Sequence, residues 1–322
     1  MAVRNWTFVS LLCLAAPLVH AQQGRVAGPV AGYVFDSAAR ALRPVLGIPG
    51  ASLLGDPVSL GMDLASAAVS PWLDSVLAVA ADGSFHIFTL NNGTVGEVPV
   101  NGITAAPERV VFSPVGSAAA LYAGGRIQVV TGLPASPTPG STFDLTPILS
   151  NPGGRGHRPL TGSFAVSDDG AYVLVAEGPG VQLFAAGSSR QIVAGHNTAL
   201  AFAPGNHDAG VAGLGVTLVK DVGGAAAQQV IAPDDARQAA VGLGFSADGS
   251  KLYLASASAR GVATFDLTAG TRSVIPCDCA PAEITGMGSL YRLNEVGPNP
   301  LWLLDATASG PRIVFVPAKP SL

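Results

Sequence analysis

The side chains that could do chemistry in this 322-residue chain stand in a few polar segments between apolar runs. Arginine and histidine together could bind an anionic group, and carboxylates near a histidine could hold a divalent metal ion. We take seven residues in three such segments as candidate ligand-binding residues: Arg155, His157 and Arg158, then His196, then Asp234, Asp235 and Arg237. The competing interpretation is that these segments are polar only because loops face water.

No catalytic residue can be assigned from the sequence. The spacing Gly-x-Ser-x-Gly, which places a serine nucleophile on a sharp turn, is absent. We interpret His86 as a packed or edge histidine inside a strand, and His207 with Asp208 as part of a turn. An enzyme is therefore the less favoured reading, and no cofactor or metal ion is expected.

Two closely spaced cysteines remain once an N-terminal signal is removed. Cys277 and Cys279 flank Asp278, and we expect them to form a disulfide, although a free thiol pair stays open. Binding of zinc or copper by these thiols is less favoured, because no second cluster at ligand spacing accompanies them.

The N-terminus has the pattern of a secretory signal. Arg4 precedes an apolar run from Trp6 to Val19, and small residues follow at the end of that run. We predict a signal peptide over residues 1–21 and one domain over residues 22–322, in a secreted or periplasmic protein. The run is shorter than the roughly 20 residues of a transmembrane helix, so no membrane span is expected after cleavage.

Charge limits the partners that the chain could bind. Only 12% of its residues are charged, and the formal net charge is −4. No basic stripe could neutralise phosphates, so the composition argues against a nucleic-acid partner. A protein, peptide or glycan partner remains possible, and we expect a monomer.

A short pattern of apolar strand, turn and apolar strand recurs along the chain. Its anchors at residues 70, 113, 167, 203 and 246 are separated by 43, 54, 36 and 43 residues. Each repeat has room for about four short strands, and the second strands are apolar throughout, which indicates burial on both faces. Such a repeat is typical of a β-propeller blade. We expect Asp169 and Asp248 to shape the turns.

The segment from Phe245 to Ile275 resembles the repeat of YVTN-type β-propellers, which are related in pattern to lactonase and TolB-like propellers. Residues Phe164 to Val193 match it nearly as well. We therefore expect an all-β propeller of six blades, closed by pairing Gly32–Asp36 and Arg43–Leu46 with a three-stranded C-terminal unit. Seven blades are the alternative. The Gly/Pro-rich segments 134–140 and 151–158 are interpreted as loop.

In a propeller of this strand order, the loops between consecutive blades surround one mouth of the central channel. The candidate residues fall in these loops, together with Glu108, Arg109, Asp278 and Glu283. Convergent loops of this kind are common ligand sites. The sequence thus favours a non-catalytic binding scaffold. The alternative is a propeller enzyme, a lactonase-like hydrolase or a lyase, with a metal ion in the channel.

Overall fold

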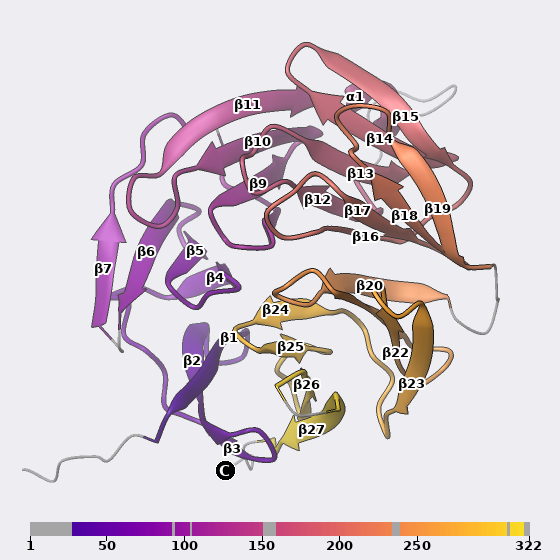
Figure 1. The fold of residues 1–322 in the computed structure, drawn as a ribbon. Helices are drawn as coiled ribbons and strands as arrows, with labels where there is room; N and C mark the ends of the chain where they lie inside the picture. Colours follow the sequence, from indigo (N-terminus) through magenta and orange to yellow (C-terminus); the bar gives the residue numbers. More distant parts are fainter. Residues whose placement is uncertain are drawn as a thin grey trace, which may run out of the picture.

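The computed structural model describes residues 28–91, 94–103, 105–150, 159–233, 239–307 and 310–318. These residues form seven antiparallel sheets arranged in a ring, the blades of a β-propeller (Figure 1). We number the blades 1 to 7 along the chain. The strands, inner strand first in each blade, are β1 Val30–Asp36, β2 Ala41–Ile48, β3 Ala51–Leu54; β4 Leu64–Val69, β5 Ser75–Ala80, β6 Phe85–Asn91, β7 Thr94–Val98; β8 Arg109–Phe112, β9 Ala118–Ala123, β10 Arg126–Thr131, β11 Thr138–Asp144; β12 Phe164–Val166, β13 Val173–Glu177, β14 Gly180–Ala185, β15 Ser188–Ala194; β16 Ala199–Phe202, β17 Ala209–Ala212, β18 Val216–Lys220, β19 Ala227–Ala232; β20 Ala240–Phe245, β21 Lys251–Ser256, β22 Gly261–Asp266, β23 Thr271–Pro276; β24 Thr285–Met287, β25 Leu290–Arg292, β26 Leu301–Asp305 and β27 Arg312–Val316.

The apolar second strands are buried on both faces, as their sequences predict. All six residues of β5 and all five of β13 are buried, whereas the outer strands β19 and β23 are mostly exposed. Seven hydrophobic clusters lie one between each pair of neighbouring blades in the described part of the chain. The hydrophobic core is therefore itself a ring, and each blade is held by both of its neighbours.

The expectation of six blades is wrong, and the alternative of seven is confirmed. The N-terminal strands do not complete the last blade. They form a sheet of their own with β3, a strand that the sequence analysis did not foresee. The last blade has four strands because its expected first strand is split at Gly288, whose φ of +64° permits the tight turn between β24 and β25.

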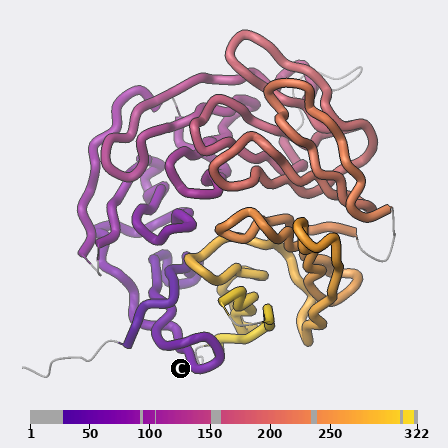
Figure 2. Tube along the Cα trace, viewed as in Figure 1, coloured from indigo at the N-terminus to yellow at the C-terminus, as the bar shows by residue number. Residues whose placement is uncertain are grey.

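Blade 1 has three strands, and its inner strand runs opposite to that of blade 2. The turn after β1 lies beside the start of β4, since the amide of Leu64 donates to the carbonyl of Arg40 at 2.8 Å. Blade 1 is thus a blade without the usual first strand. Two clusters, one against blade 2 and one against blade 7, close the ring around it. Figure 2 shows the first and last blades, in indigo and yellow, side by side.

The long connection between Ser113 and Ser167 contains more regular structure than expected. Strand β11 begins at Thr138, inside the predicted loop 134–140, and a short helix, α1, spans Thr146–Leu149. Residues 151–158 lie outside the described part of the chain. No helix within the described residues has the length and apolarity needed to cross a membrane.

Candidate functional site

The turns after the inner strands are closed by a repeated serine. In blade 6, the Ser246 hydroxyl donates to Asp248 Oδ1 at 2.6 Å and accepts from the amide of Lys251 at 2.9 Å. In blade 4, Ser167 makes the matching contacts with Asp169 and the amide of Tyr172. The predicted role of the two aspartates as turn formers is therefore confirmed.

A cavity of about 940 Å³ runs along the axis of the ring and is lined by the inner strands of all seven blades. One mouth is formed by the loops that join consecutive blades, and we call it the loop mouth. The other is formed by the turns that follow the inner strands, and we call it the turn mouth. A cavity of this size is within the range of ligand sites.

The structure tests only part of the predicted ligand set. Arg155, His157, Arg158, Asp234, Asp235 and Arg237 lie outside the described residues. His196 is exposed in the loop between β15 and β16, and it is not among the residues that line the cavity. Glu108, Arg109 and Glu283 do line it.

Arg109 is a half-buried cation of the loop mouth. Its Nη1 donates to the carbonyls of Gly162 at 2.8 Å and Leu160 at 3.4 Å, and its guanidinium carbon lies 4.9 Å from the centre of the Phe164 ring. Burial lowers the pKa of Arg109, while Tyr122 acts in the opposite direction. An arginine remains charged under such a shift, so the Arg109 guanidinium keeps its positive charge beside the cavity. Its contacts also hold the wall between blades 3 and 4 in place.

Across the same mouth, Glu283 and Arg292 form a two-point ion pair. Arg292 Nε lies 2.9 Å from Glu283 Oε1, and Arg292 Nη2 donates to Oε2 at 3.0 Å. Thr285 also donates to Oε2 at 2.9 Å. The sequence analysis missed Arg292, because it lay inside a segment interpreted as one continuous strand.

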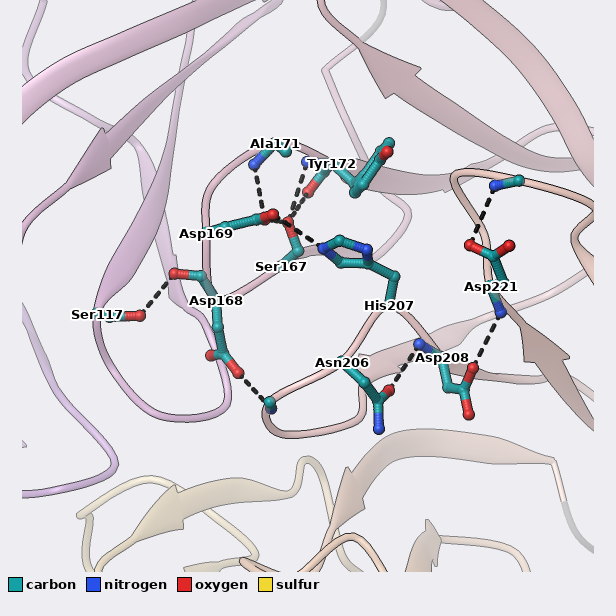
Figure 3. A network of polar contacts seen from close by, with 12 residues as sticks. Ser117, Ser167, Asp168, Asp169, Ala171, Tyr172, Asn206, His207, Asp208 and Asp221 are labelled. Atoms are coloured by element: carbon teal, nitrogen blue, oxygen red, sulfur yellow. Dashed lines mark hydrogen bonds and ion pairs between the residues drawn. The ribbon is translucent and has the colours of Figure 1, made fainter.

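The turn mouth holds a network of hydrogen bonds between blades 3, 4 and 5 (Figure 3). Asp168 accepts from the amide of Val115 at 2.9 Å and from the amide of Gly205 at 2.8 Å, so one side chain joins three blades. His207 Nε2 lies 2.9 Å from Asp169 Oδ2. This network fixes the turns against each other.

Ser167, Asp169 and His207 are the residue types of a serine-hydrolase triad, but their contacts are not those of a triad. Ser167 is buried and donates to Asp169, and histidine contacts the far oxygen of the same carboxylate. Burial alone would raise the pKa of Asp169, but hydrogen bonds from Ser167, Ala171 and His207 outweigh it and hold that pKa below its usual value. Asp208 accepts from the amide of Asp221, as the turn interpretation of His207 and Asp208 predicts.

A second polar chain lies on blade 2. Ser84 Oγ is 2.7 Å from His86 Nε2, and His86 Nδ1 is 2.7 Å from Glu97 Oε1. The Ser84 hydroxyl is also 2.6 Å from Asp82, which accepts the Ser84 amide as well. Sequence reasoning missed this chain, because Glu97 reaches His86 only through the pairing of β6 with β7.

In the structure a disulfide bond links Cys277 and Cys279, directly after the end of β23. Both side chains are buried, and the amide of Cys277 donates to the carbonyl of Arg260 at 2.8 Å. The oxidised state of the pair in the native protein stays a prediction. No three His, Cys, Asp or Glu side chains among the described residues lie close enough together to hold a metal ion.

Comparison with known proteins finds similarity in structure only. No protein-family model and no curated protein matches the sequence. A functionally unknown protein from Desulfotomaculum acetoxidans has 14% identity and a TM-score of 0.56, with 89% of this chain and 99% of that chain covered. A putative 6-phosphogluconolactonase from Bacteroides fragilis has 17% identity and a TM-score of 0.56, with 89% and 97% covered. At these identities the likeness shows that the chain has the β-propeller fold.

Proposed function

We propose that this protein is a secreted or periplasmic binding propeller, in which the axial cavity and its mouths hold part of a protein, peptide or glycan partner. One observation carries the proposal: two charged side chains that line the cavity, Arg109 and Glu283, are already engaged with groups of its wall. Arg109 holds the carbonyls of Leu160 and Gly162, and Glu283 holds Arg292.

Groups fixed in this way suit binding better than catalysis. A general acid or base must exchange a proton with a reacting group, and a group tied to structural partners is less free to do so. A rigid, preformed cavity instead lowers the ordering cost of binding, since its lining does not have to rearrange. A propeller with seven interlocked blades supplies such a cavity.

The test is capture of a partner by the immobilised mature protein from an extract of the source compartment. Ala201 lies on β16, lines the cavity and packs against the cluster between blades 5 and 6, so Ala201→Trp should narrow the cavity, and circular dichroism verifies that the variant is folded. Gln229→Trp on the exposed strand β19 is the matched control. We expect Ala201→Trp to lose the captured partner and Gln229→Trp to keep it. Equal capture by both variants would place binding elsewhere and contradict the proposal.

Localisation is tested separately. Export with removal of residues 1–21 predicts a mature protein that begins at Gln22. N-terminal sequencing of protein recovered from the compartment outside the inner membrane should find this residue. An uncleaved chain that stays with the cytoplasmic fraction would contradict the proposed location.

A further inference from the structure

A tryptophan occupies a turn position at which blades 4 and 6 place an aspartate that closes the turn, and blades 3 and 5 place Val115 and Gly205. The second residue after the inner-strand serine is Asp169 in blade 4 and Asp248 in blade 6, and each carboxylate accepts the hydroxyl of its serine. In blade 2 the same position holds Trp72, which is 65% exposed. Trp72 therefore places a large, exposed aromatic side chain at the edge of the cavity, where a ligand can reach it.

The turn adapts its backbone to present this side chain. Leu73 has a φ of +61°, a conformation that a bulky residue rarely adopts. The carboxylate that closes the turn comes from Asp74, which accepts the Ser70 hydroxyl at 2.6 Å. Leu73 packs into the clusters on both faces of blade 1, whereas the Trp72 side chain stays exposed. Strain of this kind tends to persist where it serves a function.

The surroundings of Trp72 are apolar and rigid. Trp72 lines the cavity at the turn mouth together with Pro71, Pro114, Pro204 and Ala247. The amide of Gly288 donates to the carbonyl of Pro71 at 2.6 Å, which fixes this turn to blade 7. The turns of blades 3, 4 and 5 are fixed to each other through Asp168. The turn mouth therefore exposes the Trp72 indole beside a preformed set of apolar residues. We call Pro71, Pro114, Pro204 and Ala247 the proline collar.

The charge around the collar is negative. The turns over residues 70–75, 113–118, 167–172, 203–208, 246–251 and 287–290, all described, hold five aspartates and one lysine: Asp74, Asp168, Asp169, Asp208, Asp248 and Lys251. Lys220 of β18 pairs with Asp208 at 2.7 Å, and the aspartates still outnumber the two lysines. Hydrogen bonds keep the pKa of Asp169 and Asp248 low, so these carboxylates are ionised at neutral pH. A mouth of this sign attracts cations and repels anions.

We propose that the turn mouth binds an extended peptide segment that carries arginine or lysine, with the cationic group stacked on Trp72 and its apolar neighbours against the proline collar. An indole is the aromatic ring that attracts a cation most strongly, and the carboxylates in the turns of blades 2, 4, 5 and 6 add a longer-range attraction. The inference rests on the proposed binding function and names both the face and the class of partner.

The experiment uses Trp72 as its own reporter. The chain has three tryptophans, Trp6, Trp72 and Trp302, so a full-length protein with Trp6→Phe and Trp302→Phe keeps only the one at the mouth. The probe is a capped Pro-Arg-Pro-Arg peptide, and its control is the same peptide with uncharged citrulline in place of arginine. Circular dichroism verifies that each variant is folded.

We expect a saturable change in Trp72 emission with the arginine peptide and binding at least about fivefold weaker with the citrulline peptide. Anisotropy of the labelled arginine peptide should show a similar loss for Trp72→Ala, and a smaller loss for Trp72→Phe. The affinity should fall as salt is raised. No saturation up to about 1 mM peptide, or equal affinity for both peptides, overturns the inference.

Two other outcomes also decide against it. Saturable binding of a neutral oligosaccharide in place of the peptide would make the mouth a glycan site, and a Trp72-dependent dimer would make it an interface between copies. Failure at the turn mouth is distinguishable from failure of the proposed function. If only the turn-mouth inference fails, Ala201→Trp still abolishes partner capture, whereas Trp72→Ala leaves capture unchanged.

Discussion

Serine and aspartate side chains close the turns of blades 4 and 6. The Ser246 hydroxyl satisfies a backbone amide that the turn would otherwise leave without a partner, and Asp248 holds that hydroxyl. The contacts recur in blade 4 with Ser167 and Asp169. Because the same hydrogen bonds close the turn in both blades, the serine and aspartate positions could be recognised in the sequence.

Asp248 gives the first prediction. Its hydrogen bonds from Ser246 and Ser250 lower its pKa to about 2, so it stabilises the folded state above the pKa of the unfolded chain. That stabilisation is lost as the pH falls from about 4 to about 2. We expect Asp248→Asn to cost about 1 kcal/mol at pH 6, a discounted value because the side chain is exposed.

The measurement is urea unfolding of the wild type and the variant at pH 6 and pH 2.5. The difference between them should shrink at the lower pH. The control is Asp278→Asn, an exposed carboxylate with no side-chain hydrogen bond in the described part of the chain. A penalty for Asp248→Asn that stays the same at both values of pH would contradict the role given to its charge.

Ser84 gives the second prediction. Its hydroxyl is shared between Asp82 and His86, and its amide is held by Asp82, so that amide is not free to stabilise an oxyanion. We expect no labelling of Ser84 by a fluorophosphonate probe at pH 8. Labelling of Ser84 that disappears in His86→Ala would show that Ser84 is a reactive nucleophile, and it would support the hypothesis that the protein is an enzyme.

Strands were predicted where apolarity was continuous and missed where it was not. The fully buried strands β5 and β13 were located from their apolar residues alone. Strand β3 was missed, because its four residues alternate in exposure and lie among glycines. The split between β24 and β25 was missed too, since one glycine with positive φ separates two segments that both read as strand. Short strands between turns give too few residues for periodicity to decide.

Two matched glycines test how the turns pack on their neighbours. Gly170 and Gly205 both have a positive φ, 69° and 71°. A Cβ on Gly170 would lie 2.5 Å from the Thr131 side chain of blade 3, whereas a Cβ on Gly205 would meet nothing within 4 Å. We expect Gly205→Ala to cost about 1 kcal/mol from strain and Gly170→Ala to cost about 2 to 3 kcal/mol, since it adds a clash. Chemical denaturation measures both, and equal costs would contradict the packing of this turn against blade 3.

At the scale of the whole molecule, the sequence could predict a propeller but not how its ends meet. The repeat period gave the architecture, and the seven-blade alternative is the one that the structure shows. Closure depends on the cluster that packs Val34 and Val45 of blade 1 against Met287 of blade 7, more than two hundred residues away, which no local pattern encodes. Membership of the YVTN-type group stays a prediction.

The candidate site was predictable only in part for the same reason. Loop polarity pointed correctly to Arg109 and Glu283 at the cavity, but it gave no sign of Arg292, which reaches Glu283 through the pairing of β24 with β25. Trp72 could have been noticed as a residue that breaks the turn pattern of its repeat. Function in such a fold depends on side chains that the ring brings together from different blades.

A cross-link between blades 2 and 7, whose inner strands meet where blade 1 lacks its first strand, tests the closed ring most directly. A Cβ on Gly286 would lie 3.4 Å from the Pro71 Cβ, close to the separation found in disulfides. In a chain with Cys13, Cys277 and Cys279 replaced by serine, we predict that Pro71→Cys with Gly286→Cys forms an intramolecular disulfide under mild oxidation. Peptide mass mapping should recover the two cysteines joined. A folded, monomeric variant in which both thiols remain free would contradict the closed seven-bladed ring.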